Sequence, residues 1–223
     1  MKLVNTEWER AIEFEESKIS TVVIEDAKYF RYVVKEFINQ NNGWEGKFIL
    51  SDSNKEIDIG KKVMILSDIF DLNSSIKRAN SKLIQYLKII SLDYFEETQA
   101  IVSKLEMCLD EIVQEVSLPI CRSEGIKIEE IFKASDIHVD MGNDIIENII
   151  NTVDICTSLL DTKLFVLINI HNILSKEERE YFIKSIVAKK CNVLVFESEI
   201  PRYTAIDSGF EKLYIIDNEL CEL

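Results

Sequence analysis

The spacing of hydrophobic residues changes sharply between residues 20 and 40. Residues 22–24 are three consecutive β-branched residues, which is typical of a strand buried on both faces. After two acidic residues the apolar positions recur at helical spacing, at Phe30, Val33, Val34 and Phe37. This spacing predicts an amphipathic helix. A strand that runs directly into such a helix indicates one half of a parallel α/β unit, so the rest of the chain must supply neighbouring strands.

The turn between this strand and helix is acidic. In many nucleotide-binding enzymes, a glycine-rich loop and a lysine at such a turn enclose phosphate groups. Here the turn reads Glu25-Asp26-Ala27-Lys28. Two carboxylates suit the positive end of a helix and would repel a phosphate, so we expect a capped helix and no triphosphate chemistry. Asn169 ends a later strand, where an NTPase would carry a Mg²⁺-binding aspartate.

Other apolar segments predict a head domain built from both ends of the chain. Residues 2–14 favour a short hairpin, and by residue 70 we expect three strands of one sheet. Ser175 and Glu178 form a capping box that predicts a helix over 176–189. The remaining buried strands are expected over 47–50, 63–66, 163–170, 191–196 and 213–216. The strand–helix–strand order predicts parallel crossovers.

Between these two parts the pattern is helical. No glycine occurs from residue 73 to residue 124, and apolar residues fall at helical spacing through two long segments before Pro119. A short helix is expected over 127–135, an extended stretch over 137–141, and a long returning helix over 143–160. We therefore predict an α/β fold with a mostly parallel sheet. Its head domain comprises residues 1–72 and 143–223, and a helical leg domain comprises residues 73–142.

Composition narrows the functional classes. The chain has 26 Lys and Arg against 40 Asp and Glu, a net charge of −14, which on average disfavours nucleic acid. A ring or groove could still gather its lysines on one side. No apolar run approaches 18 residues, so we expect a cytoplasmic protein without a membrane span. The five cysteines are scattered and form no C-x-x-C pair, which favours reduced thiols over disulfides or zinc.

Candidate chemistry is sparse. His138 and His171 lie outside any metal-binding motif, so we expect surface or packing roles for them. Leg carboxylates could hold a hard cation such as calcium, although such runs are usually solvated helix faces. Lysines at four positions could contact phosphate, or could serve only solubility and i,i+4 pairing. These are Lys28, Lys35, Lys127 and Lys133. The residues alone do not choose between these alternatives.

Four segments in order resemble the CRISPR-associated spacer-acquisition family Csn-two of type II-A systems. They are TVVIEDAKYFRYVVKEF, VMILSDIFDLNSS, IKIEEIFKAS and KLFVLINIHNILSKEE. The resemblance spans nearly the whole chain and implies a head related to a degenerate P-loop NTPase fold. It further implies a homotetrameric, calcium-stabilised ring without enzymatic activity. Such a ring binds double-stranded DNA ends without sequence preference, alongside the CRISPR integrase proteins and the type II effector nuclease.

The resemblance also suggests site residues. Calcium sites of the family draw on leg carboxylates, and the resemblance makes Glu115, Glu124 and Glu129 the candidate ligands here. The loop before the short helix, ICRSEG, carries a single carboxylate, so the number of ions is open. The four lysines named above become candidates for the inner rim of the ring. Two alternatives stay open: a divergent nucleotide hydrolase on the same sheet, and an acidic scaffold that binds basic proteins.

Overall fold

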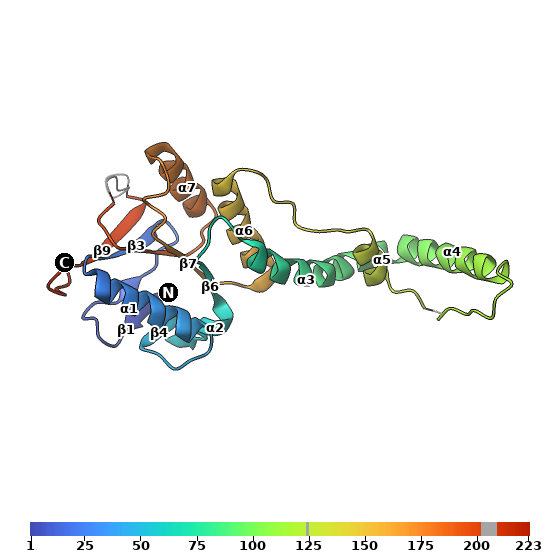
Figure 1. Cartoon of the computed structure of the whole chain (residues 1–223), viewed down its shortest axis with the longest axis horizontal. Helices are drawn as coiled ribbons and strands as arrows, with labels where there is room; N and C mark the ends of the chain where they lie inside the picture. Colours follow the sequence, from blue (N-terminus) through green and yellow to red (C-terminus); the bar gives the residue numbers. More distant parts are fainter. Residues whose placement is uncertain (124, 202–208) are drawn as a thin grey trace. The chain divides into compact units, whose positions relative to one another are not determined.

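The structure is a computed structural model that describes residues 1–123, 125–201 and 209–223. The chain divides into two compact units, which Figure 1 shows coloured along the sequence. The head unit comprises Met1–Leu72 and Met141–Leu223, and the leg unit comprises Asn73–Asp140. No described helix combines the length and the apolar character that a membrane crossing requires.

A five-stranded parallel sheet forms the centre of the head unit. Its strand order is β6-β7-β8-β3-β9, and each neighbouring pair is parallel. The strands are β3 (Ile19–Ile24), β6 (Val63–Leu66), β7 (Leu164–Ile168), β8 (Val193–Glu197) and β9 (Glu211–Ile216). All six residues of β3 are buried, as its run of β-branched residues predicts. The α/β fold class and the parallel sheet are therefore confirmed.

A second, antiparallel sheet corrects one expectation. Its order is β2-β1-β4-β5, formed by β1 (Lys2–Asn5), β2 (Ile12–Glu13), β4 (Phe48–Asp52) and β5 (Lys55–Ile57). The predicted hairpin is present as β1 and β2. The strand predicted over 47–50 was wrongly assigned to the parallel sheet. Phe48 and Leu50 are buried whereas Ile49 is 44% exposed, and this alternation suits a sheet with one solvated face.

Helices cover both faces of the parallel sheet, with α1 (Ala27–Asn41) and α7 (Lys176–Ala188) on opposite sides in Figure 1. The head also contains α2 (Ile59–Lys62) and α6 (Ile145–Leu160). Val33 and Phe37 of α1 belong to one apolar cluster with Val22 of β3 and with Phe48 and Leu50 of β4. One core therefore holds α1 between the two sheets. The predicted capping box at Ser175 and Glu178 is present.

The leg unit is helical, so the predicted helical insertion is also confirmed. It contains α3 (Asn73–Ile90), the 3₁₀ helix η1 (Ser91–Tyr94), α4 (Phe95–Gln114) and α5 (Ile128–Ala134). Lys88 of α3 forms an ion pair with Glu129 of α5. Residues 137–141, expected to be extended, form neither a helix nor a paired strand. The backbone N–H of Val139 instead donates to Oδ1 of Asn80 on α3, at 2.9 Å.

Candidate nucleic-acid interface

The exposed side of α1 carries the α1 basic face, which we define as Lys28, Arg31 and Lys35. Their spacing of three and four residues places them on one side of the helix. Phe30, Val33 and Phe37 are buried on the other side. Arg31 was not among the sequence candidates, although its position three residues after Lys28 could have identified it. Within the described ranges, none of these three cations takes part in an ion pair.

Several other head cations are already neutralised by carboxylates of the same chain. Nζ of Lys62 lies 2.6 Å from Asp161, and Nζ of Lys189 lies 2.6 Å from Asp154. Further pairs at 3.0 to 3.6 Å are Lys61–Asp58, Lys184–Glu180 and Lys212–Glu13. A cation paired in this way has less charge to offer an incoming anion. The α1 basic face is therefore a place where the acidic head can attract phosphate.

Aromatic residues support this helix from the side. Nε1 of Trp8 donates to Oη of Tyr29 at 3.1 Å, and the rings of Tyr29 and Tyr32 stack with centroids 6.0 Å apart. Nζ of Lys47 donates to Oη of Tyr32 at 2.6 Å and also pairs with Glu7. Hydrogen bonding to Glu7 raises the pKa of Lys47. Glu7, Trp8 and Lys47, the residue before β4, thus hold the outer surface of α1 in place.

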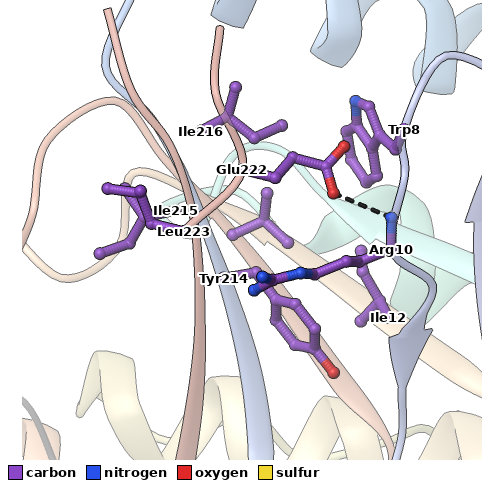
Figure 2. Close-up of a pocket in the computed structure, with 9 residues that line it drawn as sticks. Trp8, Arg10, Ile12, Tyr214, Ile215, Ile216, Glu222 and Leu223 are labelled. Atoms are coloured by element: carbon purple, nitrogen blue, oxygen red, sulfur yellow. Dashed lines mark hydrogen bonds between the residues drawn. The ribbon is translucent and has the colours of Figure 1, made fainter.

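The C-terminal residues stabilise the same region. The Glu222 carboxylate accepts hydrogen bonds from the backbone N–H groups of Glu9 and Arg10, at 2.7 and 2.8 Å. Figure 2 shows this carboxylate beside the Trp8 ring, with the Arg10 side chain extending toward Tyr214. The cavity beneath has a volume of about 20 Å³, and Ile12, Val22 and Ile216 are among its lining residues. That volume leaves room for little more than a water molecule, so the contact is structural.

The acidic turn before α1 caps the helix, as predicted. Oδ1 of Asp26 accepts a hydrogen bond from the backbone N–H of Tyr29 at 2.7 Å. Glu25 accepts one from Asn218 at 3.2 Å. Both carboxylates are therefore engaged in holding the turn, which leaves this position poorly suited to enclose a phosphate.

Asn169 also has a structural partner. It has a positive φ of 52°, and its Oδ1 accepts hydrogen bonds from the backbone N–H and the hydroxyl of Ser198, at 3.0 and 3.1 Å. Its own N–H donates to the carbonyl of Phe196 at 2.8 Å. Asn169 therefore connects the ends of β7 and β8. Its amide oxygen is already used within the fold.

The two leg lysines predicted from the sequence are exposed. Lys127 is the N-cap residue of α5, and Lys133 lies in its last turn. Both are close together on one short helix, whereas Lys28 and Lys35 belong to the head unit. The structure thus groups the four candidates into two pairs on separate units.

The predicted calcium ligands do not form a set in one chain. Glu115 is the exposed C-cap residue of α4, and Glu124 lies outside the described residues. Glu129 is held by Lys88, whose hydrogen bond lowers the pKa of Glu129. Across residues 1–123, 125–201 and 209–223, no group of three or more His, Cys, Asp or Glu side chains could hold a metal ion. These residues therefore do not fit a calcium site within a single described chain.

Nearby acidic residues of α4 are engaged by the following loop. Oε1 of Glu106 accepts hydrogen bonds from the N–H groups of Gly125 and Ile126, at 2.8 and 3.0 Å. These bonds lower the pKa of Glu106. Nε of Arg122 lies 2.6 Å from Asp110, and this contact lowers the pKa of Asp110. The two carboxylates therefore hold the loop in place.

A buried ionic cluster in the head was not anticipated from the sequence. Nη2 of Arg179, on α7, donates to both carboxylate oxygens of Glu211, at 3.1 and 3.0 Å. The Thr21 hydroxyl donates to the same carboxylate at 2.7 Å. His171 lies between Glu211 and Glu197, with ring nitrogens 3.8 and 3.5 Å from their oxygens. His171 is 5% exposed and so has the packing role expected for it, whereas His138 is exposed.

Comparison with known proteins gave one family match. A family model described as CRISPR-associated protein (Cas_Csn2) matches residues 40–220. Among solved structures, an ABC transporter ATP-binding protein from Pyrococcus furiosus matches with 13% identity and a TM-score of 0.39. The match covers 96% of this chain and 97% of that chain. No curated protein sequence matches the chain.

Proposed function

The chain belongs to the Cas_Csn2 family of CRISPR-associated proteins, and from this premise we propose that it binds the ends of double-stranded DNA without catalysing a reaction. It acts in the cytoplasm during the acquisition of new CRISPR spacers. Its partners there are the CRISPR integrase proteins and the type II effector nuclease. The observation that carries the proposal is the α1 basic face, whose three cations form no ion pair with any described residue. Contacts of this kind reach phosphates rather than bases, so binding is independent of sequence.

Self-assembly resolves the conflict between a net charge of −14 and DNA binding. In a homotetrameric ring, the basic faces of several copies converge on a central opening while most carboxylates face outward. The local potential then attracts phosphates although the whole particle repels them. A duplex enters such an opening only from a free end, which explains a preference for ends.

An apolar seam on α4 supports self-association. Ile101, Leu105, Cys108 and Ile112 follow a 4-3-4 spacing, which is the pattern of a coiled-coil seam. Ile101 and Ile112 are 58% and 55% exposed, and Leu105 is 37% exposed. A second copy of the chain would bury this seam. We define these four residues as the α4 seam.

Calcium is proposed to stabilise the assembly rather than to act in one chain. Carboxylates from more than one copy would then supply the ligands, since a calcium ion takes six to eight oxygens. Glu115 is a candidate ligand that forms no ion pair with any described residue, and Glu124 lies outside the described residues. Glu129 would have to break its ion pair with Lys88 before it could bind calcium. The mass of the assembly with and without calcium tests this part directly.

Two other functions receive less support. A nucleotide hydrolase would need a phosphate-binding turn, whereas Glu25 and Asp26 fill that position and Asn169 is bonded to Ser198. An acidic scaffold for basic proteins is consistent with the net charge of −14. It gives no role to the unpaired cations of α1.

The proposal is tested by comparing two charge-matched double variants. Lys28→Glu/Lys35→Glu reverses two of the three charges of the α1 basic face, and Lys61→Glu/Lys184→Glu reverses two lysines that are already ion-paired. Affinity for a linear duplex is measured over a range of salt concentrations. The first variant should lose at least about tenfold in affinity and show a smaller salt slope, because each phosphate contact contributes about 0.9 to that slope. Equal losses in both variants, or no DNA binding by the unmodified protein, would contradict the proposal.

A further inference from the structure

Charge in the leg unit is segregated by helix. Helix α3 carries four cations and no carboxylate, and the chain contains no acidic residue between Asp71 and Asp93. Helix α4, which follows it, carries five carboxylates and one lysine. In a chain with a net charge of −14, an 18-residue helix without a single carboxylate is a pronounced local excess of positive charge.

Three cations of α3 lie together on its exposed side. Ile76 and Ala79 are buried, whereas Lys77, Arg78 and Lys82 are exposed. Arg78 and Lys82 are i,i+4 neighbours on the helix surface, and Lys77 is adjacent to them. We call these three residues the α3 basic face. The fourth cation, Lys88, is used by Glu129.

The α3 basic face has no anionic partner within the described leg. Lys77, Arg78 and Lys82 form no ion pair with any residue that the structure describes. Nζ of Lys82 donates a hydrogen bond to Oε1 of Gln85 at 3.3 Å, and this partner is uncharged. Carboxylates are abundant on α4, but Glu106 and Asp110 are bound by Arg122 and by the loop after it.

The chemistry of this face matches a phosphate backbone better than a protein. Ser81 and Gln85 lie beside its cations, and hydroxyl and amide side chains are common partners of phosphate together with Lys and Arg. A protein-binding surface has an apolar centre, whereas the exposed apolar residues of α3 begin only at Tyr86. From Lys77 to Lys82 the helix rises about 7.5 Å. Measured along the duplex axis, this length corresponds to about two phosphates of one DNA strand, at about 3.4 Å of rise each.

We propose that the α3 basic face is a second phosphate-contacting surface of the chain, which binds duplex DNA. This inference rests on the proposed function, and it assigns residues of the leg unit to DNA binding in addition to those of the head. The α3 basic face offers three cations for contact with phosphate. The leg lysines predicted from the sequence, Lys127 and Lys133 at α5, offer two.

The test uses charge removal that preserves helix propensity. Arg78→Gln/Lys82→Gln is compared with Lys104→Gln/Lys184→Gln, a control that removes the same charge from α4 and α7. Affinity for linear duplex, its salt dependence and the mass of the assembly are measured on the full chain. The first variant should bind duplex at least about tenfold more weakly, and its affinity should depend less steeply on salt concentration. Its assembly mass should be unchanged. The control variant should match the unmodified protein in all three measurements.

Other outcomes separate this inference from the proposed function. If Arg78→Gln/Lys82→Gln binds normally while Lys28→Glu/Lys35→Glu does not, the α3 inference is wrong and the proposed function stands. If the α3 variant loses assembly mass, its face contacts the acidic α4 of a second copy, and the inference is again wrong. If the unmodified protein binds no DNA, the proposed function itself fails.

Discussion

Nδ1 of His171 lies 3.5 Å from Oε1 of Glu197, and both side chains are completely buried in the head unit. Burial lowers the pKa of His171 from 6.5 to about 3. Burial also raises the pKa of Glu197 from 4.5 to about 7. In the folded protein the neutral form of each group is therefore favoured, and one proton resides on Glu197 over most of the range between these values.

These shifts predict the pH dependence of unfolding. Between pH 4.5 and 7 the folded state keeps the Glu197 proton that the unfolded state has lost, so the unfolding free energy falls as the pH rises. Between pH 6.5 and 3 the unfolded state binds a proton on His171 that the folded state does not, so the unfolding free energy falls as the pH is lowered. The two effects cancel between about 4.5 and 6.5. The contribution of this pair to the unfolding free energy should be flat there, fall by about 2 kcal/mol toward pH 3, and fall by under about 1 kcal/mol as the pH rises from about 6.5 to about 7. Urea unfolding at several pH values measures this profile.

The variant Glu197→Gln isolates one half of this pair. The backbone N–H of His171 donates to Oε1 of Glu197 at 2.9 Å, and a glutamine oxygen can accept the same bond. With Glu197 removed from the titration, stability should rise with pH up to about 6.5 and stay constant above it. A variant whose profile matches that of the unmodified protein would show that Glu197 does not titrate in this range.

The ion pair of Arg179 and Glu211 should be essential for folding stability. Arg179→Met removes the guanidinium that pairs with the buried Glu211 carboxylate, whereas the hydrogen bond from the Thr21 hydroxyl to that carboxylate stays. We expect a loss of about 3–5 kcal/mol in unfolding free energy. Lys184→Met on the same helix is the control, because Lys184 is exposed and should change stability by less than about 0.5 kcal/mol. A loss below about 1 kcal/mol for Arg179→Met would refute the assignment.

Asp26 should contribute to stability and not to DNA binding. Asp26→Ala removes the hydrogen bond to the N–H of Tyr29 and should cost about 1 kcal/mol of unfolding free energy. It also removes a negative charge near the α1 basic face, so affinity for duplex should be equal or higher. Weaker DNA binding by folded Asp26→Ala protein would mean that the turn has a direct role in the site.

The α4 seam should control assembly. Leu105→Glu places a charge in the middle of the seam, whereas Lys104→Glu places one beside it. Light scattering should give a lower mass for Leu105→Glu and an unchanged mass for Lys104→Glu, since a charge at a seam position opposes coiled-coil packing. Equal masses for the two variants would exclude this seam as a contact between copies.

Local signals in the sequence predicted much of the fold. The β-branched run before α1, the cap at Asp26 and the capping box at Ser175 depend only on neighbouring residues, and all three are present. The second sheet was missed because it depends on register between distant segments, with Asn5 paired to Phe48. Spacing alone does not reveal such pairing.

The candidate site was less accessible from sequence. A cation can contact phosphate only if no carboxylate of the same chain already pairs with it. Which cations are paired depends on where carboxylates such as Asp161 and Glu129 lie in the folded protein, and the sequence does not give these positions. The cluster of His171, Arg179 and Glu211 joins three separate segments and has no local signature. By contrast, the absence of carboxylates from α3 is visible in the sequence itself and could have been used.

The most direct test of the central claim compares one duplex sequence in linear and covalently closed circular form. Binding is measured by gel shift at several salt concentrations, with and without calcium. A closed ring that threads a DNA end should bind the linear form and leave the circle largely free, and cutting the circle once should restore binding. Equal affinity for the linear and closed forms would contradict an end-binding ring.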